Sequence, residues 1–497
     1  MSHCSRNKDA STEARAVVAA HGDDMDDLCY LTASEALARF ADKSLSPVEL
    51  LEAQIARAEA TAETVNAFTD TYFDEALDQA HASEARWSKG APNGCLDGLP
   101  VAIKDESYIA GKRTTFGSLT SQDFVPDHTS TINARIMAEG GIVHARTATP
   151  EFSCAGVTWT RLWGVTRNPW NTDFTPGGSS GGSAASLASG TSSLATGSDI
   201  GGSIRIPASC CGLVGYKPPY GRNPDEIPFN LDFYCHTGPL ARSVDDAILL
   251  QNVMSGPDPR DISTLYPKLV LPKDYPDIRG WKIALSMDLG SFTISEEVRR
   301  NTLAAAQVFR DLGAEVVEVD LGWGDEVQEA CFAYLTHIFG GSLSALLADH
   351  ADDMTPYCRR FAEGSQGSTA QDYVRTLEVA GQSYLTLGPL LEEYDALICP
   401  TTAIPAVPAD FDGLALDIEG KSVRPELGWV LTTPFNMMSR CPVLQVPSGF
   451  GANGVPTGIQ IVGPTYRDER VFQAAKAYEA ALGGWFGSSA ASRPSLA

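Results

Sequence analysis

VTRNPWNTDFTPGGSSGGSAASLASGTSSLATGSDIGGSIRIPASCCGLVGYKPPYGR, residues 165–222, contains two clusters rich in glycine and serine. The first is Gly177-Gly-Ser-Ser-Gly-Gly182, and the second is Asp199-Ile-Gly-Gly-Ser203. Because glycine has no Cβ, the backbone can turn sharply in such clusters, and its N–H groups can approach a ligand closely. Both clusters are therefore typical of loops that hold a phosphate group or an oxyanion.

A phosphate-binding loop of the Walker type ends in Gly-Lys-Ser or Gly-Lys-Thr, and no lysine follows these glycines. The residues Gly177–Gly181 also fit G-x-S-x-G, the nucleophile elbow of α/β-hydrolases, which follows a strand. The preceding segment, Asn168–Pro176, is turn-like rather than strand-like. His236, His337 and His350 lie downstream, so composition leaves a histidine-based triad open as an alternative.

The segment between the two clusters predicts that they meet in space. Its small residues predict a helix over Ser183–Ser189, followed by a short strand over Ser193–Thr196. A helix that leads directly into a strand would place Ser179 close to Ser203. This arrangement favours a hydrolytic serine site over two merely flexible loops.

The rest of the chain predicts an α/β fold. Capping boxes at Thr32–Glu35 and Ser46–Glu49 each precede apolar residues at helical spacing, so two helices open the fold. Further helical patterns cover 72–88, 244–253 and 297–312, and short apolar runs typical of buried strands cover 98–104, 141–145, 281–285, 315–321, 396–399, 443–447 and 458–462. Without an internal repeat or a low-complexity linker, this alternation predicts one large domain over residues 28–490. Residues 1–27 are small and polar and are expected to form a flexible extension.

Composition narrows the class of protein. The chain has 497 residues, of which 43% are hydrophobic, so a large enclosed core is feasible. A net charge of −25 repels phosphate backbones and disfavours nucleic-acid binding. The 11 cysteines include no CxxC pair and no Cys/His cluster, which predicts reduced thiols in a cytoplasmic protein without a metal or another cofactor. No apolar run approaches the ~20 residues of a membrane span, so we expect no membrane partner.

These motifs resemble the amidase signature family. The Gly-Gly-Ser-Ser-Gly-Gly loop, the run Gly-Ser-Asp-Ile-Gly-Gly-Ser-Ile-Arg-Ile-Pro-Ala and the run Gly-Leu-Val-Gly-Tyr-Lys-Pro carry the resemblance. Family-like segments also lie at Gly98–Asp105, Arg113–Ser118, Thr149–Phe152, Trp163–Trp170, Gly238–Ser243 and Pro434–Asn436 through Gly463. One departure is Pro219, where many members carry threonine. The resemblance implies a single large domain with a mixed, mostly buried central β-sheet flanked by helices.

The resemblance also implies a Ser-Ser-Lys triad. Ser203 matches the family's nucleophile, Ser179 matches the bridging serine, which is reached through a cis peptide bond, and Lys104 matches the general base. An alkyl hydroxyl needs a base to attack a carbonyl, and a lysine is a base only when it is neutral. Burial disfavours the charged ammonium, so a buried Lys104 without a carboxylate partner would suit that role.

The same match implies an oxyanion hole. The backbone N–H groups of Ile200, Gly201 and Gly202, together with that of Ser203, would hold the oxygen of the tetrahedral intermediate. Ser180 is expected to support this network by hydrogen bonding. Arg205 is interpreted either as a structural anchor for Asp199 or as a clamp for substrate.

Two segments are expected to form the substrate pocket. They are the loop Ser153–Trp163, with Ser153, Thr158 and Trp159 as candidate binding residues, and the helical segment Ala330–Tyr384. Trp159 and Trp163 could equally be core residues. Because these segments hold aromatic and apolar residues with few charges, they predict a medium-sized apolar or aryl amide, or the corresponding ester, anilide or carbamate.

Three classes of function compete. The first is a standalone amide hydrolase that acts on a small molecule and forms an acyl-enzyme, possible as a homo-oligomer. The second is the amidase-like subunit of an aminoacyl-tRNA amidotransferase, against which the acidic charge argues. The third is a catalytically silent scaffold, which the intact set Lys104, Ser179 and Ser203 disfavours.

Overall fold

The computed structural model describes residues 25–486 and 493–496. Most of the expected N-terminal extension therefore lies outside the described residues, as does the end of the expected domain at residues 487–490. Helix α2 (Met25–Cys29) begins before the expected boundary at residue 28. The Asp27 carboxylate lies 2.7 Å from an Arg493 guanidinium nitrogen, so the last described segment packs against the first helix.

Within the described residues, one sheet holds eleven strands. In spatial order they are β1 (Phe68–Thr71), β3 (Ile142–Thr147), β2 (Pro100–Lys104), β6 (Leu194–Asp199), β8 (His236–Ala241), β7 (Val214–Lys217), β14 (Val443–Phe450), β15 (Pro456–Val462), β11 (Ala396–Pro400), β9 (Lys282–Leu285) and β10 (Glu315–Glu318). The pairs β3/β2, β2/β6, β11/β9 and β9/β10 are parallel, and the other neighbours are antiparallel. Two small hairpins pair β4 (Trp159–Thr160) with β5 (Gly164–Val165) and β12 (Leu416–Ile418) with β13 (Lys421–Val423). The predicted mixed sheet is confirmed.

All the strands expected from apolar runs are present, whereas β1, β7 and β8 were not predicted. β8 lies in the middle of the sheet between β6 and β7, and every residue of it is buried. Its sequence contains Gly238-Pro239, which are residues that disfavour a central strand because proline cannot donate a ladder hydrogen bond. Only the pairing of β8 with both neighbours reveals it as a strand.

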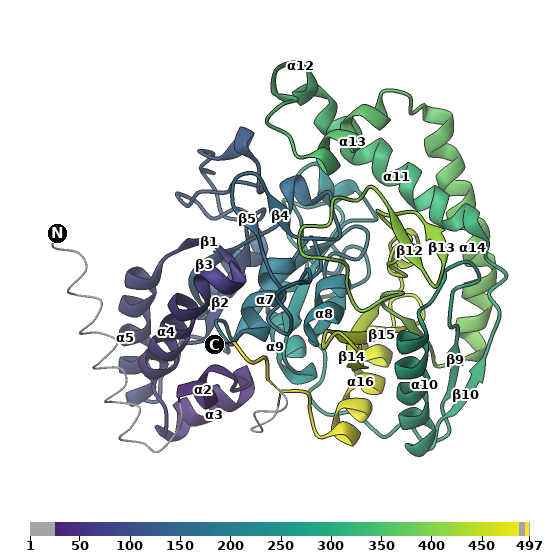
Figure 1. The fold of residues 1–497 in the computed structure, drawn as a ribbon. Coiled ribbons are helices and arrows are strands. Elements are labelled where there is room, and N and C mark those ends of the chain that lie inside the picture. The colour runs from purple at the N-terminus through teal and green to yellow at the C-terminus, as the bar shows by residue number, and fades with distance from the viewer. Residues whose placement is uncertain (1–24, 487–492, 497) are drawn as a thin grey trace.

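Helices surround the sheet, and both predicted capping boxes form. The helices are α2, α3 (Ala33–Asp42), α4 (Pro47–Val65), α5 (Phe73–Ser88), α6 (Thr131–Ala138), α7 (Gly181–Ala188), α8 (Arg205–Cys211), α9 (Val244–Met254), α10 (Glu296–Asp311), α11 (Asp325–Leu343), α12 (Leu347–His350), α13 (Pro356–Ser365), α14 (Ala370–Glu393), α15 (Pro434–Met437) and α16 (Asp468–Leu482). Figure 1 shows α2–α5 gathered at one side of the molecule and α11–α14 at the opposite side.

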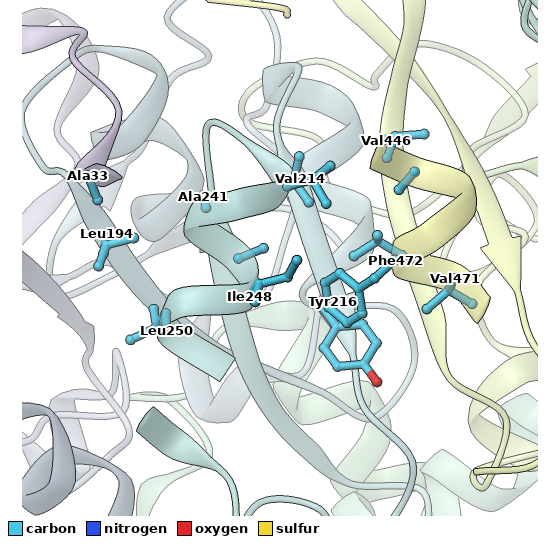
Figure 2. Close-up of a cluster of buried hydrophobic side chains, with 14 of the residues drawn as sticks. Ala33, Leu194, Val214, Tyr216, Ala241, Ile248, Leu250, Val446, Val471 and Phe472 are labelled. Atoms are coloured by element: carbon cyan, nitrogen blue, oxygen red, sulfur yellow. The ribbon is translucent and has the colours of Figure 1, made fainter. Parts of the chain in front are cut away.

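The core lies between the sheet and its helices. In Figure 2, Val214 and Tyr216 of β7 meet Ile248 and Leu250 of α9, next to Phe472 of α16. All of these side chains are at least nine-tenths buried, and the rings of Tyr216 and Phe472 lie 4.6 Å apart between centroids. Burying a large apolar side chain contributes about 1.5–3 kcal/mol, so this layer holds the sheet rigidly.

The segment Asp325–His350, which contains α11, is long and apolar enough to cross a membrane by length and composition. However, Tyr334, Leu335 and Phe339 of α11 are buried against neighbouring elements, as in an ordinary core helix. α11 packs against α13 and α14 and forms one wall of the site described next.

Candidate active site

Lys104 and Ser198 meet because β2 and β6 are parallel neighbours. Val101 of β2 lies opposite Leu194 of β6, so the two strands end at the same edge of the sheet. Lys104 is the last residue of β2, and Ser198 is the next-to-last residue of β6. Both strand ends therefore direct polar side chains into the same region.

The Lys104 side chain is buried, and its ammonium group is fully surrounded by acceptors. Nζ donates to Ser179 Oγ at 2.7 Å and to Ser198 Oγ at 2.9 Å, and it lies 3.2 Å from Glu106 Oε2. Burial lowers the pKa of Lys104 below its ordinary value, although the Glu106 carboxylate opposes this shift. The expectation that Lys104 has no carboxylate partner is therefore wrong, but the direction of its pKa shift is as expected.

Ser179 lies directly before helix α7, and the Gly178–Ser179 peptide bond is cis. The loop is packed tightly, because a Cβ at Gly178 would collide with backbone atoms of Val157. Thr158 Oγ1 donates to Gly177 O at 2.8 Å and holds the loop from the other side. Thr158 thus supports the serine loop rather than a bound molecule.

Ser203 lies directly before α8, and the two serine clusters touch. The Ser180 N–H donates to Ser203 O at 3.1 Å, and Ser180 Oγ lies within hydrogen-bond distance of the Ser198 backbone. Ser203 is only 7% exposed, and its hydroxyl forms no hydrogen bond with the described residues. A direct Ser179–Ser203 hydrogen bond is therefore absent from the described part of the chain, although the loops adjoin.

Next to Ser203, several backbone N–H groups are unoccupied. Those of Ile200, Gly201 and Ser203 donate to no acceptor within residues 25–486 and 493–496. Gly202 differs from the expectation, because its N–H donates to Asp199 Oδ1 at 2.8 Å. Its φ of +124° and the collision that a Cβ would make with Thr432 explain instead why glycine stands there.

Asp199 and Arg205 form a fully buried ion pair beneath this loop. Arg205 donates from Nε and Nη2 to the two carboxylate oxygens at 2.9 and 2.8 Å, and also to Asn436 Oδ1 at 2.6 Å. Burial by itself would raise the pKa of Asp199, but Arg205 holds it below its ordinary value. The interpretation of Arg205 as an anchor for Asp199 is confirmed, since Arg205 lines neither cavity at the site.

Two cavities meet at the serines. The smaller one, of about 70 Å³, is lined by Ser203 and Gly201, and the larger one, of about 510 Å³, is lined by Ser179 and Glu106. Residues Ser153, Ile200 and Phe339 line both cavities. The reacting atoms of any substrate would therefore lie at this junction, with one part of the molecule on each side.

The pocket residues expected from sequence separate into two groups. Ser153 lines both cavities, whereas Thr158 and Trp159 line neither. Trp159 Nε1 donates to Phe411 O at 3.1 Å, and its carbonyl oxygen accepts from Tyr357 Oη at 2.7 Å, so this side chain supports the wall from behind. From the expected helical segment, Leu335, Phe339 and Phe361 do line the smaller cavity.

A second buried lysine, Lys217, is no substitute for Lys104. Burial lowers the pKa of Lys217 to about 7. However, its Nζ donates to the carbonyl oxygens of Pro218, Ser439 and Cys441 at 3.0–3.3 Å, and it lines neither of the two cavities. Lys217 therefore fastens loops, whereas Lys104 faces a hydroxyl.

Comparison with known proteins agrees with this geometry. The model of the amidase family matches residues 49–472, which is most of the chain. The chain belongs to the amidase family. An acylamidase of Rhodococcus erythropolis is 32% identical over 462 residues, covering 91% of this chain and 96% of the relative. The amidase-like component of the glutamyl-tRNA(Gln) amidotransferase of Synechococcus sp. (strain CC9605) is 33% identical, with 88% of this chain and 93% of the relative covered.

Solved structures confirm the amidase signature fold. A bacterial aryl acylamidase of the amidase signature family superposes with a TM-score of 0.84 and 31% identity, covering 91% of this amidase and 96% of that chain. A 6-aminohexanoate cyclic dimer hydrolase complexed with substrate gives a TM-score of 0.81 at 27% identity, with 94% and 99% covered. The predicted family and fold class are both confirmed.

Three residues at the site of this amidase were missed from the sequence. Ser198 lies inside the second serine motif, and Glu106 lies one position beyond the Gly98–Asp105 motif, so a signal for both was present. Thr432 Oγ1 donates to Gly201 O at 2.7 Å from a loop far along the chain, and no local pattern marks it.

The buried ion pair gives a stability prediction. Replacing Arg205 with alanine leaves Asp199 charged and unpaired in the interior, which typically costs about 3–5 kcal/mol. We expect a clearly lower denaturant midpoint and melting temperature, measured by circular dichroism. Arg279→Ala is the matched control, because the Arg279–Asp277 pair is largely solvent-exposed. An unchanged midpoint in Arg205→Ala would contradict the anchoring role.

Proposed function

We propose that this amidase hydrolyses the carbon–nitrogen bond of amides through an acyl-enzyme on Ser203, with Ser179 as proton relay and Lys104 as base. The observation that carries the proposal is the contact of 2.7 Å between buried Lys104 Nζ and Ser179 Oγ, on a loop that adjoins Ser203. The same chemistry extends to anilides, aryl esters and carbamates that fit the cavities.

In the proposed acylation step, Ser203 Oγ forms a bond to the carbonyl carbon. The Ser203 proton passes to Ser179, the Ser179 proton passes to Lys104 Nζ, and the carbonyl π electrons move onto oxygen. When the intermediate collapses, the carbon–nitrogen bond breaks and Lys104 returns a proton through Ser179 to the leaving amine. Water then repeats the sequence on the acyl-enzyme and releases the acid.

The unoccupied N–H groups of Ile200, Gly201 and Ser203 support a place for the oxyanion. Such donors act most strongly where water is excluded, and one of them is typically worth about 2.7–4 kcal/mol of barrier. In this proposal Gly202 contributes a backbone conformation, since its own N–H is held by Asp199.

The two cavities support an orientation for the substrate. Because Ser179 hands a proton to the leaving amine and lines the larger cavity, the amine part would lie there, near the aromatic side chains of Tyr108, Phe116 and Phe229. The acyl part would occupy the smaller cavity beside Ser203. We therefore propose a short-acyl amide with a medium-sized apolar or aryl amine, a class that the name of the aryl acylamidase structure also indicates.

A substrate panel tests this orientation. We expect acetanilides to exceed long-acyl primary amides by at least ~10-fold in kcat/KM, because each methylene that a pocket rejects is worth about 1–3 kcal/mol. Hydrolysis is measured by release of the arylamine or ammonia, with carbamates and aryl esters in the same panel. Faster turnover of long-acyl primary amides than of anilides would reverse the orientation.

The second candidate function is the amidase-like component of a tRNA-dependent amidotransferase, which several relatives of about 31–33% identity favour. The net charge of −25 weighs against it. Strict glutaminase activity together with a co-purifying second protein would favour this candidate. Hydrolysis of anilides by the isolated chain would favour the first.

We further propose that this amidase works in the cytoplasm. Every cysteine among the described residues is free, including buried Cys210 and Cys211, which are neighbours in sequence. Free thiols in such number are typical of a reducing compartment.

A further inference from the structure

Glu106 faces the proposed base from the loop after β2. Its Oε2 lies 3.2 Å from Lys104 Nζ and accepts a hydrogen bond from Ser153 Oγ at 2.5 Å. The side chain is 21% exposed and lines the larger cavity beside Ser179. Glu106 is therefore held in place by Ser153 on one side and reaches the lysine on the other.

We propose that Glu106 is a positioning residue for Lys104, which directs the lysine nitrogen at Ser179 and stabilises the ammonium that forms when the nucleophile is deprotonated. This inference rests on the proposed function of Lys104 as base. It adds to the triad a carboxylate whose part resembles that of the aspartate behind the histidine in serine proteases.

Counting donors at Nζ carries the argument. A neutral amine has two N–H bonds and one lone pair, whereas an ammonium has three N–H bonds. Two acceptors, Ser198 Oγ and Glu106 Oε2, can take the two N–H bonds, which turns the lone pair toward Ser179 Oγ. Ser179 can then donate its proton to that lone pair.

The same three partners also suit the protonated state. After proton transfer, the ammonium finds an acceptor for each N–H in Ser179, Ser198 and Glu106. The Glu106 carboxylate offsets the positive charge formed in the interior, where an uncompensated charge is costly. No proton moves to or from Glu106 in this step.

The balance of charges at Lys104 explains why one carboxylate is tolerated. Burial favours the neutral amine, and Glu106 favours the ammonium, yet the pKa of Lys104 remains below its ordinary value. Burial opposes ionisation of Glu106 as well, but Lys104 keeps the pKa of Glu106 below its ordinary value. The other ionisable groups that act on this pair are Asp199 of β6, Arg146 of β3, and Asp225 and Cys235 of the loop before β8.

The test is the pH profile of Glu106→Gln with an acetanilide and an aryl ester. Removing the carboxylate removes a charge that favours the ammonium, so the pKa of Lys104 falls and the acid limb of kcat/KM moves to lower pH. On the plateau we expect kcat to fall by about 10-fold or more, within the ~10²–10⁴ that a general base contributes. Glu106→Asp retains a carboxylate and should restore the position of the limb and part of the plateau.

Two control variants separate this effect from a general change in the cavity. Glu226→Gln makes the same substitution in the same cavity without a contact to Lys104, so the limb should stay in place. Burial raises the pKa of Asp225 to about 7, so Asp225→Asn checks whether that group titrates instead. Loss of the limb in Asp225→Asn, or an unmoved limb in Glu106→Gln, would overturn the inference.

Two further readouts keep the test decisive. If Glu106→Gln is folded but too slow to assay, the rate at which a fluorophosphonate labels Ser203 is followed against pH and should show the same downward shift. If Glu106→Gln does not fold, Glu106→Asp carries the test: an unchanged limb with a lower kcat supports positioning, and a change in KM alone overturns it. A wild-type chain that neither hydrolyses the substrates nor is labelled at Ser203 contradicts the proposed function itself.

Discussion

Replacing Ser203 with alanine is expected to abolish hydrolysis of amides and esters, with a loss in kcat of at least about 10⁴-fold. The proposed nucleophile is the hydroxyl that lines the smaller cavity beside the unoccupied N–H groups of Ile200 and Gly201. The melting temperature should stay close to that of the wild type, because this hydroxyl has no hydrogen-bond partner among the described residues that its removal would leave unpaired.

Ser209→Ala provides the matched control for this variant. Ser209 is buried on the same helix that follows Ser203, and its hydroxyl also has no partner in the described part of the chain. It should retain wild-type activity. Ser179→Ala should lose somewhat less than Ser203→Ala, since water can replace the relay. A fluorophosphonate that labels a serine other than Ser203, identified by mass spectrometry, would show the nucleophile assignment to be wrong.

Replacing Lys104 with arginine is expected to be as damaging as replacing it with alanine, by about 10²–10⁴-fold in kcat/KM. Arginine preserves the positive charge beside Glu106 but cannot be deprotonated in a protein, so it cannot accept the Ser179 proton. A loss through charge alone would instead spare the arginine variant. Near wild-type amidase activity in Lys104→Arg would therefore place the base elsewhere.

The pH dependence of the wild type and Lys104→Ala completes this test. If the neutral lysine is the base, kcat/KM rises with pH as the free enzyme loses that proton, and the optimum lies on the alkaline side of neutral. The acid limb should disappear in Lys104→Ala. Aryl esters should retain more activity than matching amides in both variants, because a phenolate leaves without a proton from lysine. An acid limb that persists in Lys104→Ala would show that another group titrates.

Much of the fold could be predicted from local patterns. The capping boxes at Ser46–Glu49 and Thr32–Glu35 and the continuous apolar runs of β2 and β11 depend only on neighbours in the chain. β8 could not be predicted in the same way, since its Gly238-Pro239 pair disfavours a strand and only the flanking strands β6 and β7 impose one.

The candidate site was predictable to the extent that it lies in contiguous motifs. Ser179, Ser203 and Lys104 stand in such motifs, and the structure brings the Lys104 amine and the Ser179 hydroxyl to 2.7 Å. By contrast, Trp159 resembles a pocket residue in sequence but faces the wall behind the cavities. The direction of a loop side chain depends on what packs against the loop, and that partner, near Phe411, is remote in the sequence.

The sequence by itself thus determined the family, the alternation of strands and helices, and the residues that could carry acyl transfer, because each of these depends on residues close together in the chain. Only the tertiary structure decided that Glu106 and Ser198 surround the Lys104 amine, that Gly202 has already used its N–H, and that two unequal cavities meet at Ser203. These properties depend on which strand ends lie side by side and on what remains unfilled between packed helices. Contacts between distant residues set both, and no pattern of neighbouring residues encodes them.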